Sequence, residues 1–416
     1  MNLHGIDQKR KYEYFFIICI GAYVLFTIFD FMICKGAVQW ETLLNGRDFI
    51  ADYTNVIGYA SNRNPYDSTI ANGLQERAYP PLQYVFSYLV SLTVPDMQYY
   101  YDIQDFTGMY MNTQVAMLYL LFVVISVIGI FELVRGFKNG SNLVKTLTAL
   151  ALTLSFPVLI TIERGNSVLI VIVFVLFYLC FYDHDNRVLR EMAFIALALA
   201  AGIKLMPAVL GVLLIIEKRW KEVIRTVIYG LASFFLPFLF FEGGFKNVPL
   251  FFRNLSLQLE AYKFIPDCTL RGFILTYFPD YAYDNIDSVK TICTVVTLLI
   301  CTLMLVASFL TKRKGDRLVY LCMLLIIMPS HSASYNLLYL FPCMIALLNE
   351  TDKLKLDLFI LLGGCLSICT LGGPLGSILV NWHVGLLIII ICAIVKSVEV
   401  IVKRLDKKNK DAELIY

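Results

Sequence analysis

The chain has 416 residues, of which 58% are hydrophobic and only 16% are charged. A soluble domain averages about 25% charged residues, so this composition excludes an ordinary soluble protein and indicates an integral membrane protein. The formal net charge of +3 is too small to suggest a nucleic-acid partner.

Apolar segments recur along the chain and predict an all-α fold. A membrane span needs about 20 predominantly apolar residues, and counting segments near this length gives about 12 transmembrane helices. No internal repeat or soluble domain is apparent, so residues 1–416 are predicted to form a single transmembrane domain. The predicted spans are 14–34, 113–134, 144–162, 167–182, 190–203, 206–217, 221–241, 288–310, 317–329, 335–348, 356–371 and 382–402.

Two pairs of these segments are too short to cross a membrane alone. Each pair meets at a polar, proline-containing break, at residues 204–207 and 329–335. Irregular backbone at membrane depth is tolerated only where it is buried in protein or lines a water-filled cavity. The breaks therefore predict helices that end at a water-accessible cavity.

The distribution of positive charge predicts the orientation. In this topology 24 of the 35 lysine and arginine residues fall on one side, which is therefore expected to be cytoplasmic and to hold both termini. Two long loops, at about 35–112 and 242–287, are then extracytoplasmic. Each contains a short apolar stretch, Leu82–Val94 and Val248–Leu259, that is typical of an interfacial helix lying on the membrane.

The first outer loop carries two carboxylates that suit a catalytic base. Asp48 and Asp52 are four residues apart, so on a helical turn they would share one face. A carboxylate beside a membrane cavity can take the proton from an attacking sugar hydroxyl, and such a base contributes about 10²–10⁴ in rate. The alternative is that both acids are solvated, or paired with Arg47 and Arg63.

Three basic side chains lie beside apolar sequence and suit a phosphate. Arg164 follows Glu163 between two apolar runs, and it either pairs with a loop carboxylate or holds a phosphate. Lys204 is the only cation inside a stretch of about 26 residues of apolar sequence, so it faces a cavity or an anion, or snorkels to the interface. His331 binds a phosphate or a sugar hydroxyl, or is a hydrogen-bonded histidine in a tight turn. No cluster has metal-ligand spacing, so no metal or other cofactor is predicted.

Five short motifs, in this order, resemble the GT-C superfamily of membrane glycosyltransferases. The resemblance is strongest to glycosyltransferase family 87, which includes mycobacterial phosphatidylinositol-mannoside mannosyltransferases. The motifs are Asp48-Phe49-Ile50-Ala51-Asp52-Tyr53, Asn64-Pro65-Tyr66, Tyr79-Pro80-Pro81-Leu82, Arg164-Gly165-Asn166 and Ile203-Lys204-Leu205-Met206-Pro207. The chain departs from the family at Glu163 and in its late segment, where His331 lies close to Pro329 and Tyr335 stands near the place of the family's histidine.

The resemblance implies a fold of GT-C type and an inverting glycosyltransferase. Its donor would be a polyprenyl phosphate that carries one sugar, mannose or another hexose. Its acceptor would be a hydroxyl of a glycolipid or glycan polymer on the extracytoplasmic face of the cell membrane. Such enzymes usually work without a bound metal.

The resemblance also implies roles for individual residues. Asp48 would deprotonate the acceptor hydroxyl, with Asp52 as the second candidate. Lys204, Arg164 and His331 would hold the donor phosphate, because the leaving group needs cations more than an acid. The positions implied for substrate binding are Asn64, Tyr66, Tyr79, Asn166 and Tyr335.

Two other classes of protein share part of this pattern. A secondary transporter or lipid flippase would also have broken helices and polar groups near the midplane, but this chain has no inverted repeat. A polysaccharide polymerase or ligase would depend on arginine and histidine in late outer loops, whereas the acids here lie in the first loop.

Overall fold

The chain is all-helical and forms two compact units. The computed structural model describes residues 8–33, 49–66, 77–103, 105–352, 354–369 and 381–413. Every regular element in these ranges is a helix and none is a strand, which confirms the all-α prediction. Unit 1 consists of Met1–Gln39, Lys138–Phe156 and Ile265–Tyr416, and unit 2 of Trp40–Phe137 and Pro157–Phe264. Both units are assembled from segments that alternate along the sequence.

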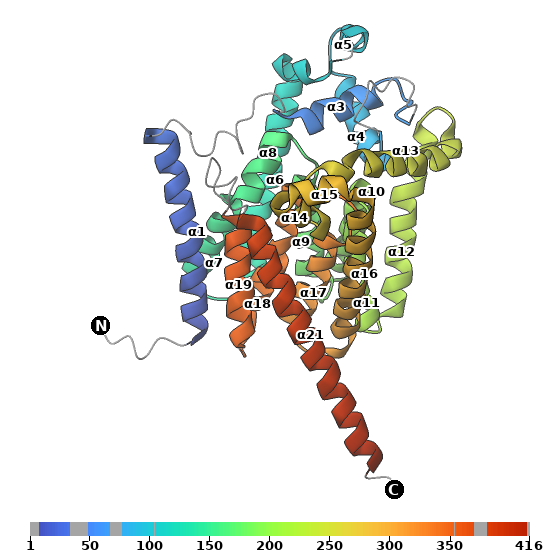
Figure 1. Ribbon diagram of the computed structural model, residues 1–416. Coiled ribbons are helices and arrows are strands. Elements are labelled where there is room, and N and C mark those ends of the chain that lie inside the picture. The colour runs from blue at the N-terminus through green and yellow to red at the C-terminus, as the bar shows by residue number, and fades with distance from the viewer. Residues whose placement is uncertain are drawn as a thin grey trace. The chain divides into compact units, whose positions relative to one another are not determined.

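Five helices in the described ranges are long and apolar enough to cross a membrane. They are α1 (Gln8–Ile33), α6 (Thr113–Phe137), α12 (Trp220–Phe235) with η5 (Leu236–Phe240), α16 (Ile286–Leu310) and α21 (Asn381–Glu413) (Figure 1). The count is six if α7 (Asn142–Thr153) and α8 (Phe156–Arg164), which meet at a bend, form one span. These helices support a multi-span membrane protein.

The other predicted spans are shorter helices. They are α9 (Val168–Phe181), α10 (Arg187–Ile203), η4 (Met206–Gly211) with α11 (Val212–Ile216), α17 (Lys314–Ile327), η8 (Ser334–Tyr339) with α18 (Leu340–Asn349), and α19 (Lys355–Ile368). Each of the twelve apolar segments predicted from the sequence therefore contains a helix in its described residues.

Local sequence signals fix the ends of α10, which positions a predicted site residue. The helix begins after Asn186, whose side-chain oxygen accepts hydrogen bonds from the N–H groups of Val188 (2.8 Å) and Leu189 (3.3 Å). The last residue of α10 is Ile203. The next residue, Lys204, has an extended backbone, and Pro207 follows in the next turn. Lys204 therefore lies in a break between two helices.

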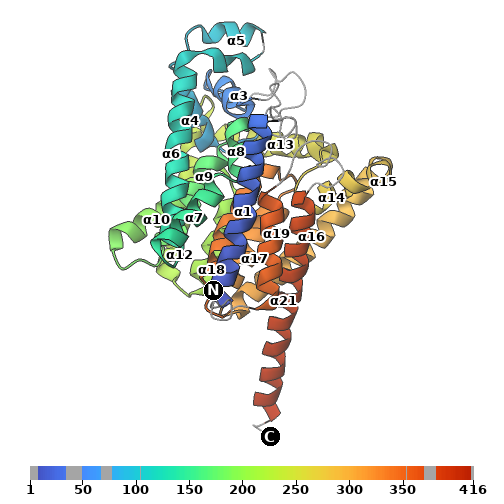
Figure 2. The ribbon, with the colours of Figure 1, turned by 90° about the vertical axis from the view of Figure 1, so that its left-hand side faces the viewer.

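In unit 2, polar and charged residues lie at the two ends of the helices. At the end where α9 stops and α10 begins, Arg219 lies 3.4 Å from Asp183, and Arg225 pairs with Glu191. The α8–α9 turn and those helices of the two long loops that belong to unit 2 lie at the opposite end (Figures 1 and 2). Lys204, after the other end of α10, contacts Tyr79 of the first of these loops. Within unit 2, the described segments that were predicted to be extracytoplasmic therefore gather together.

Both stretches that were predicted as interfacial helices are helical. α4 (Pro81–Ser91) begins with a proline in its first turn, where the fixed φ and the missing N–H are favourable. α13 (Asn247–Ala261) runs across the direction of α12 (Figures 1 and 2). They share an aromatic core with the 49–66 segment and η5, formed by buried Tyr66, Tyr84, Phe238, Phe241 and Phe251.

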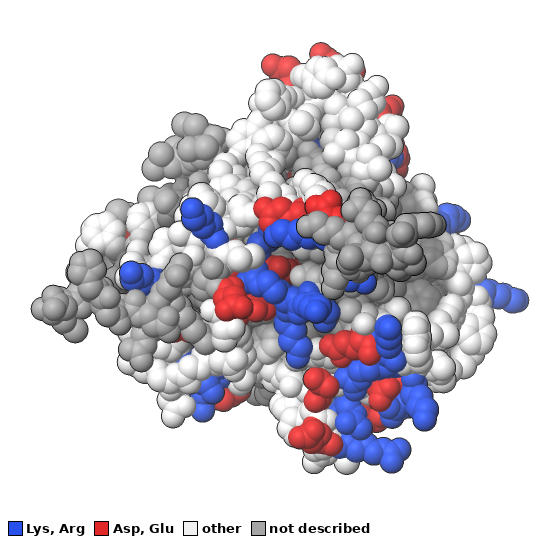
Figure 3. Space-filling view, turned by 90° about the horizontal axis from the view of Figure 1, so that it is seen from below, with Lys and Arg blue, Asp and Glu red and all other residues white. Residues whose placement is uncertain are grey.

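One end of unit 1 is rich in charge. There Lys138 lies 2.6 Å from Glu13 of α1, and the N–H of Asn139 donates to the side-chain oxygen of Asn349 at 2.8 Å. The face seen in Figure 3 carries many lysine and arginine side chains, with acidic side chains among them.

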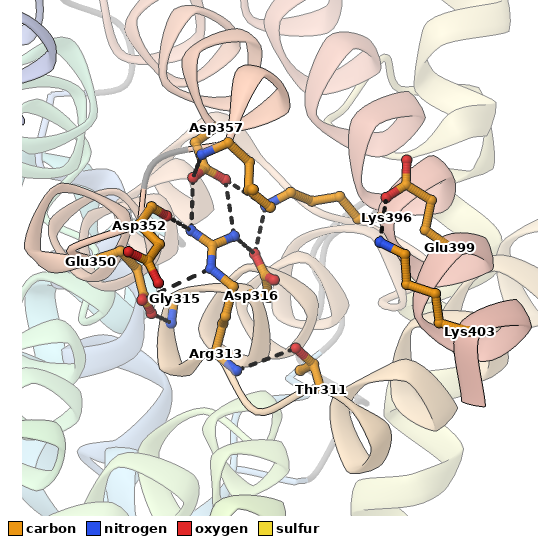
Figure 4. A network of polar contacts seen from close by, with 11 residues as sticks. Thr311, Arg313, Gly315, Asp316, Glu350, Asp352, Asp357, Lys396, Glu399 and Lys403 are labelled. Atoms are coloured by element: carbon orange, nitrogen blue, oxygen red, sulfur yellow. Dashed lines mark hydrogen bonds and ion pairs between the residues drawn. The ribbon is translucent and has the colours of Figure 1, made fainter. Parts of the chain in front are cut away.

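A buried charge network joins α21 to the starts of α17 and α19 (Figure 4). The ammonium of Lys396, which is 2% exposed, lies 2.5 Å from a carboxylate oxygen of Asp316 and 2.5 Å from one of Asp357. Arg313 contacts the same two acids at 3.0 and 2.8 Å. Because buried charges are costly unless they are paired, this network fixes the register of α21 against its neighbours.

Replacing Lys396 by methionine is expected to destabilise the protein by about 3 kcal/mol, because it leaves buried carboxylates undercompensated. The measurement is thermal unfolding of the detergent-purified protein. Lys403→Met is the matched control on the same helix, since Lys403 contacts Glu399 at 3.7 Å between exposed side chains. Such an exposed pair contributes less than about 1 kcal/mol. Equal melting temperatures for the two variants would contradict the proposed contribution of the network.

Candidate active site

One carboxylate in unit 2 is held by two side chains from a distant turn. Asp52 lies in the first turn of α3 (Ala51–Ala60), and its Oδ1 lies 3.1 Å from Nη2 of Arg164. Its Oδ2 accepts a hydrogen bond from Nδ2 of Asn166 at 2.7 Å. The side chains of Asp52 and Arg164 remain 14% and 25% exposed, so a ligand can reach them. The fold therefore brings together three residues that the sequence singled out separately.

The turn between α8 and α9 is shaped to meet the start of α3. The N–H of Ile50 donates to the carbonyl oxygen of Glu163 at 2.7 Å. Asn166 is fully buried, and its Oδ1 accepts a hydrogen bond at 3.0 Å from the N–H of Val168, the first residue of α9. The asparagine side chain thus binds the start of α9 with its oxygen and Asp52 with its nitrogen.

The backbone before Asp52 departs from the predicted helical spacing. Ile50 has a φ of 47° and a ψ of 22°, which lie in the left-handed region, so α3 does not extend back through it. This conformation strains a β-branched residue by about 1–2 kcal/mol. A helical turn that would place Asp48 and Asp52 on one face is therefore interrupted at Ile50. Asp48 itself lies outside the described residues.

Gly165 allows the close approach of this turn to α3. Its φ is +68°, and a Cβ added to it would lie 2.8 Å from Cβ of Tyr53 and 3.1 Å from Cα of Ile50. Glycine adopts this backbone without steric cost and leaves the space empty. The contact between Asp52 and the α8–α9 turn therefore depends on glycine at this position.

Gly165→Ala is expected to displace the start of α3 and to lower activity by about 100-fold, the typical result of a misplacement of about 1 Å. The backbone strain adds about 1–2 kcal/mol of destabilisation. Rates of sugar transfer and melting temperatures of the purified variants test this. Gly230→Ala is the control, because Gly230 is inside α12 and an added Cβ meets nothing within 4 Å. Wild-type activity of Gly165→Ala would show that the close approach is unnecessary.

Aromatic rings support α3 beside Asp52. The ring centroid of Tyr53 lies 5.0 Å from that of Tyr119 and 6.2 Å from that of Phe122, both on α6. The hydroxyl of Tyr119 donates to the carbonyl oxygen of Ile162 in α8. The rings and this hydrogen bond tie α3, α6 and α8 together at one place.

Lys204 lies at the same end of unit 2 as Asp52. Its Nζ lies 4.4 Å from the centroid of the Tyr79 ring, in the geometry of a cation–π contact. Burial lowers the pKa of Lys204 to about 8, and the carboxylate of Asp52 acts in the opposite direction. The two charges are therefore within electrostatic reach, and residues from three of the predicted motifs share one region.

Tyr59 and Tyr262 lie within electrostatic reach of Asp52, and Arg77 contacts Tyr59; none of the three was singled out from the sequence. Tyr59 lies two turns farther along α3, and the guanidinium carbon of Arg77 lies 4.9 Å from its ring centroid. Burial raises the pKa of Tyr262, while the charges of Asp52 and Arg164 act on this hydroxyl in opposite directions. The available signal for Arg77 was its position directly before the Ala-Tyr-Pro-Pro turn at 78–81.

The Asn-Pro-Tyr motif has a packing role in the structure. Tyr66 is 1% exposed, and its hydroxyl donates to the carbonyl oxygen of Tyr79 at 3.0 Å. The side-chain amide of Asn254 donates to the backbone oxygens of Tyr66 (3.1 Å) and Arg77 (3.3 Å). Asn64 is half-buried at the start of this motif. The motif thus anchors the loop that carries Tyr79.

Comparison with protein families adds an independent observation. The sequence model of glycosyltransferase family 87 matches residues 78–330, which is more than half of the chain. The chain belongs to glycosyltransferase family 87. No curated protein and no solved structure matched it.

The family 87 match covers only part of the candidate site. It begins after the acidic segment 48–52 and ends at residue 330. Membership therefore supports glycosyl transfer, whereas the choice of a base depends on sequence pattern and geometry. The predicted site residues inside the match are Tyr79, Arg164, Asn166 and Lys204.

The remaining predicted site residues of this family 87 protein belong to unit 1. His331 lies between α17 and η8, with its Nδ1 2.9 Å from Oδ2 of Asp267. Tyr335 lies half-buried in η8. Asp267 was missed from the sequence, although Asp-x-Thr before an apolar run is a capping pattern and Thr269 caps α14 (Leu270–Tyr277). Among the residues that the structure describes, no group of three or more His, Cys, Asp or Glu side chains is arranged to hold a metal ion.

Proposed function

We propose that this family 87 glycosyltransferase transfers a single hexose, mannose or a related sugar, from a polyprenyl-phosphate donor to an acceptor hydroxyl with inversion. The acceptor is a lipid-linked or polymer-linked glycan. The observation that carries the proposal is the ion pair between Asp52 and Arg164, buttressed by Asn166, with Lys204 at the same end of unit 2. Two cations beside an acidic segment suit a reaction that releases a phosphate and needs a base.

In the proposed reaction, a carboxylate of the 48–52 segment takes the proton of the acceptor hydroxyl. The acceptor oxygen forms a bond to the anomeric carbon, and the bond from that carbon to the phosphate oxygen breaks. The electron pair stays on the phosphate, whose charge Arg164 and Lys204 stabilise. Asp48 is the proposed base. Asp52, whose two oxygens already accept bonds from Arg164 and Asn166, positions the phosphate-binding guanidinium.

The sugar and acceptor contacts are proposed from position. Tyr79, which is half-buried beneath the Lys204 ammonium, is the best-placed ring to face the donor. Asn166 acts through Asp52, and Asn64 acts through its backbone oxygen, which lies 3.5 Å from the guanidinium of Arg77. Tyr66 supports Tyr79 from the core. His331 and Tyr335 of unit 1 remain sequence-based assignments to the substrate.

The proposed membrane topology has about 12 spans, with both termini in the cytoplasm and the site outside. It is supported by the 24 to 11 division of lysine and arginine and by the gathering of the predicted outer segments at one end of unit 2. The helices shorter than a full span would end at the cavity that holds the substrates.

Cysteine labelling tests this topology. Lys246→Cys, in the second long loop, should react with an impermeant thiol reagent in intact cells, because the residue is exposed and predicted to be outside. Lys314→Cys, exposed at the start of α17, should react only after permeabilisation. Labelling of Lys314→Cys alone in intact cells would invert the orientation.

The proposed activity is tested by incubating the purified protein with polyprenyl-phosphate hexoses and a membrane glycolipid extract. Release of free polyprenyl phosphate together with a glycosylated acceptor is the expected result. Nucleotide sugars serve as the comparison donors. Transfer from nucleotide sugars only, or movement of the lipid-linked sugar across vesicles without release, would overturn the proposal.

A further inference from the structure

Arg77 in unit 2 is a buried guanidinium with few polar contacts. It is 1% exposed, and its Nη1 makes one long hydrogen bond, 3.5 Å from the backbone oxygen of Asn64. Its Nε is buried and has no hydrogen-bond partner among the described residues. The guanidinium carbon lies 4.9 Å from the centroid of the Tyr59 ring. An aromatic face and one carbonyl oxygen leave most of the five N–H donors of this group without a strong acceptor.

The other buried cations of the described chain are paired with acids. Each lies between 2.5 and 3.1 Å from a carboxylate oxygen: Lys138 from Glu13, Arg271 from Asp267, and Lys396 from Asp316. Within the described ranges, Arg77 is the buried cation that forms no ion pair. A buried charge is costly unless it is paired, so the fold retains a positive charge here that its own acids do not neutralise.

The position of Arg77 connects it to the candidate active site. Burial raises the pKa of Tyr59 to about 12, and the charges of Arg77 and Asp52 act on this hydroxyl in opposite directions. Asp52 forms the ion pair with Arg164. Arg77 also precedes Tyr79, the ring that contacts Lys204, by two residues. All these residues belong to unit 2, so three cations lie around the start of α3 and the loop that follows it.

We propose that Arg77 is a further cation of the phosphate site and that it binds the phosphate of the lipid-linked donor together with Arg164 and Lys204. The inference rests on the proposed function. Arg164 is partly neutralised by Asp52, whereas the charge of Arg77 is left for a ligand. A planar guanidinium matches the oxygens of a phosphate. The phosphate approaches from the side of Asp52 and Arg164, whose side chains are 14% and 25% exposed.

The charge that Arg77 stabilises grows during the proposed reaction. The donor phosphate is a diester with a single negative charge, whereas the released polyprenyl phosphate carries about 1.5–2 negative charges near pH 7. A buried cation without a counterion stabilises the second form more than the first. Loss of the charge of Arg77 should therefore slow turnover as well as weaken binding of the donor and of the released polyprenyl phosphate.

A packing role for Arg77 predicts a different result. If the contacts with Tyr59 and Asn64 were its purpose, removing the guanidinium would destabilise the ligand-free protein. If the charge serves a ligand, an apolar side chain of similar length removes a desolvation cost and leaves the ligand-free protein at least as stable. Melting temperatures with and without ligand therefore separate the two roles.

The test compares the wild type, Arg77→Met and Arg77→Lys by thermal unfolding of the detergent-purified proteins. Each is measured alone, with polyprenyl phosphate, and with inorganic phosphate. Polyprenyl phosphate should raise the melting temperature of the wild type. Arg77→Met should melt no lower than the wild type without ligand, and its affinity for polyprenyl phosphate should be at least about tenfold weaker. Arg77→Lys should retain part of the affinity, since it keeps the charge but not the planar fork.

Arg63→Met is the matched control. Arg63 lies in the same long loop, and its guanidinium carbon is 5.0 Å from the centroid of the Phe240 ring. It is exposed, however, and its Nε donates to the carbonyl oxygen of Phe240 at 3.1 Å. Its replacement should leave the affinity for polyprenyl phosphate unchanged, because an exposed and hydrogen-bonded guanidinium is not reserved for a ligand.

The proposal is wrong if Arg77→Met melts below the wild type without ligand and still binds polyprenyl phosphate with wild-type affinity. Equal affinity of the wild type for inorganic phosphate and polyprenyl phosphate would make free phosphate the ligand and overturn the assignment to the lipid-linked donor. If Arg77→Met does not fold, Arg77→Gln decides, since wild-type affinity without the charge overturns the proposal. A protein that transfers no sugar, but whose binding of polyprenyl phosphate depends on Arg77, would reject the proposed function alone, so the two failures are distinguishable.

Discussion

Asp48→Asn is expected to reduce turnover by about 10²–10⁴-fold, because the amide has the shape of the carboxylate but cannot take the proton from the hydroxyl of the acceptor substrate. Melting temperature and donor binding should stay near those of the wild type. The measurement is the rate of polyprenyl-phosphate release at saturating donor and acceptor. Activity within a few-fold of wild type would remove Asp48 from the mechanism.

Asp52→Asn is the comparison that assigns the two roles. It breaks the ion pair with Arg164 and replaces an acceptor with an amide opposite Asn166. We expect a higher donor KM and a lower melting temperature, because Arg164 loses its contact with this carboxylate and α3 loses a tie to the α8–α9 turn. If Asp52→Asn is inactive at saturating donor while Asp48→Asn is active, the roles of the two acids are exchanged.

Lys204→Ala is expected to raise the donor KM by about 10-fold or more, because a charge-assisted contact with phosphate contributes about 1.5–3 kcal/mol. Lys204→Arg should retain part of the affinity, since it keeps the charge but not the geometry of a compact ammonium. Kinetics in nanodiscs measure both variants. Normal donor use by the alanine variant would make Lys204 a packing residue over Tyr79.

The pH dependence of the donor KM separates Lys204 from other cations. Burial lowers the pKa of Lys204 to about 8, so its ammonium is charged below pH 8 and becomes neutral above it. Donor KM of the wild type should therefore rise above about pH 8. The Lys204→Arg variant should lack this rise, because a guanidinium stays charged. A rise of equal size in both proteins would assign the effect to another group.

The helices of this protein were predictable because their signals are local. Apolar runs near span length, Asn186 before α10, and Pro81 at the start of α4 each act within one or two turns. Part of the candidate site was predictable for a different reason. Short motifs mark Asp52, Arg164, Asn166 and Lys204 one at a time, although no local rule predicts that these residues meet.

The sequence by itself determined the all-helical membrane class, the positions of the helices and the polar breaks between them. The tertiary structure alone decided which residues share the candidate site. Asp52 and Arg164, which form an ion pair, are 112 residues apart in the sequence. Tyr66 is buried in the aromatic core. Arg77 contacts the ring of Tyr59, and Asp267 lies beside His331. The physical reason is that burial and ion pairing are set by packing between distant segments, which leaves no periodic trace in either segment.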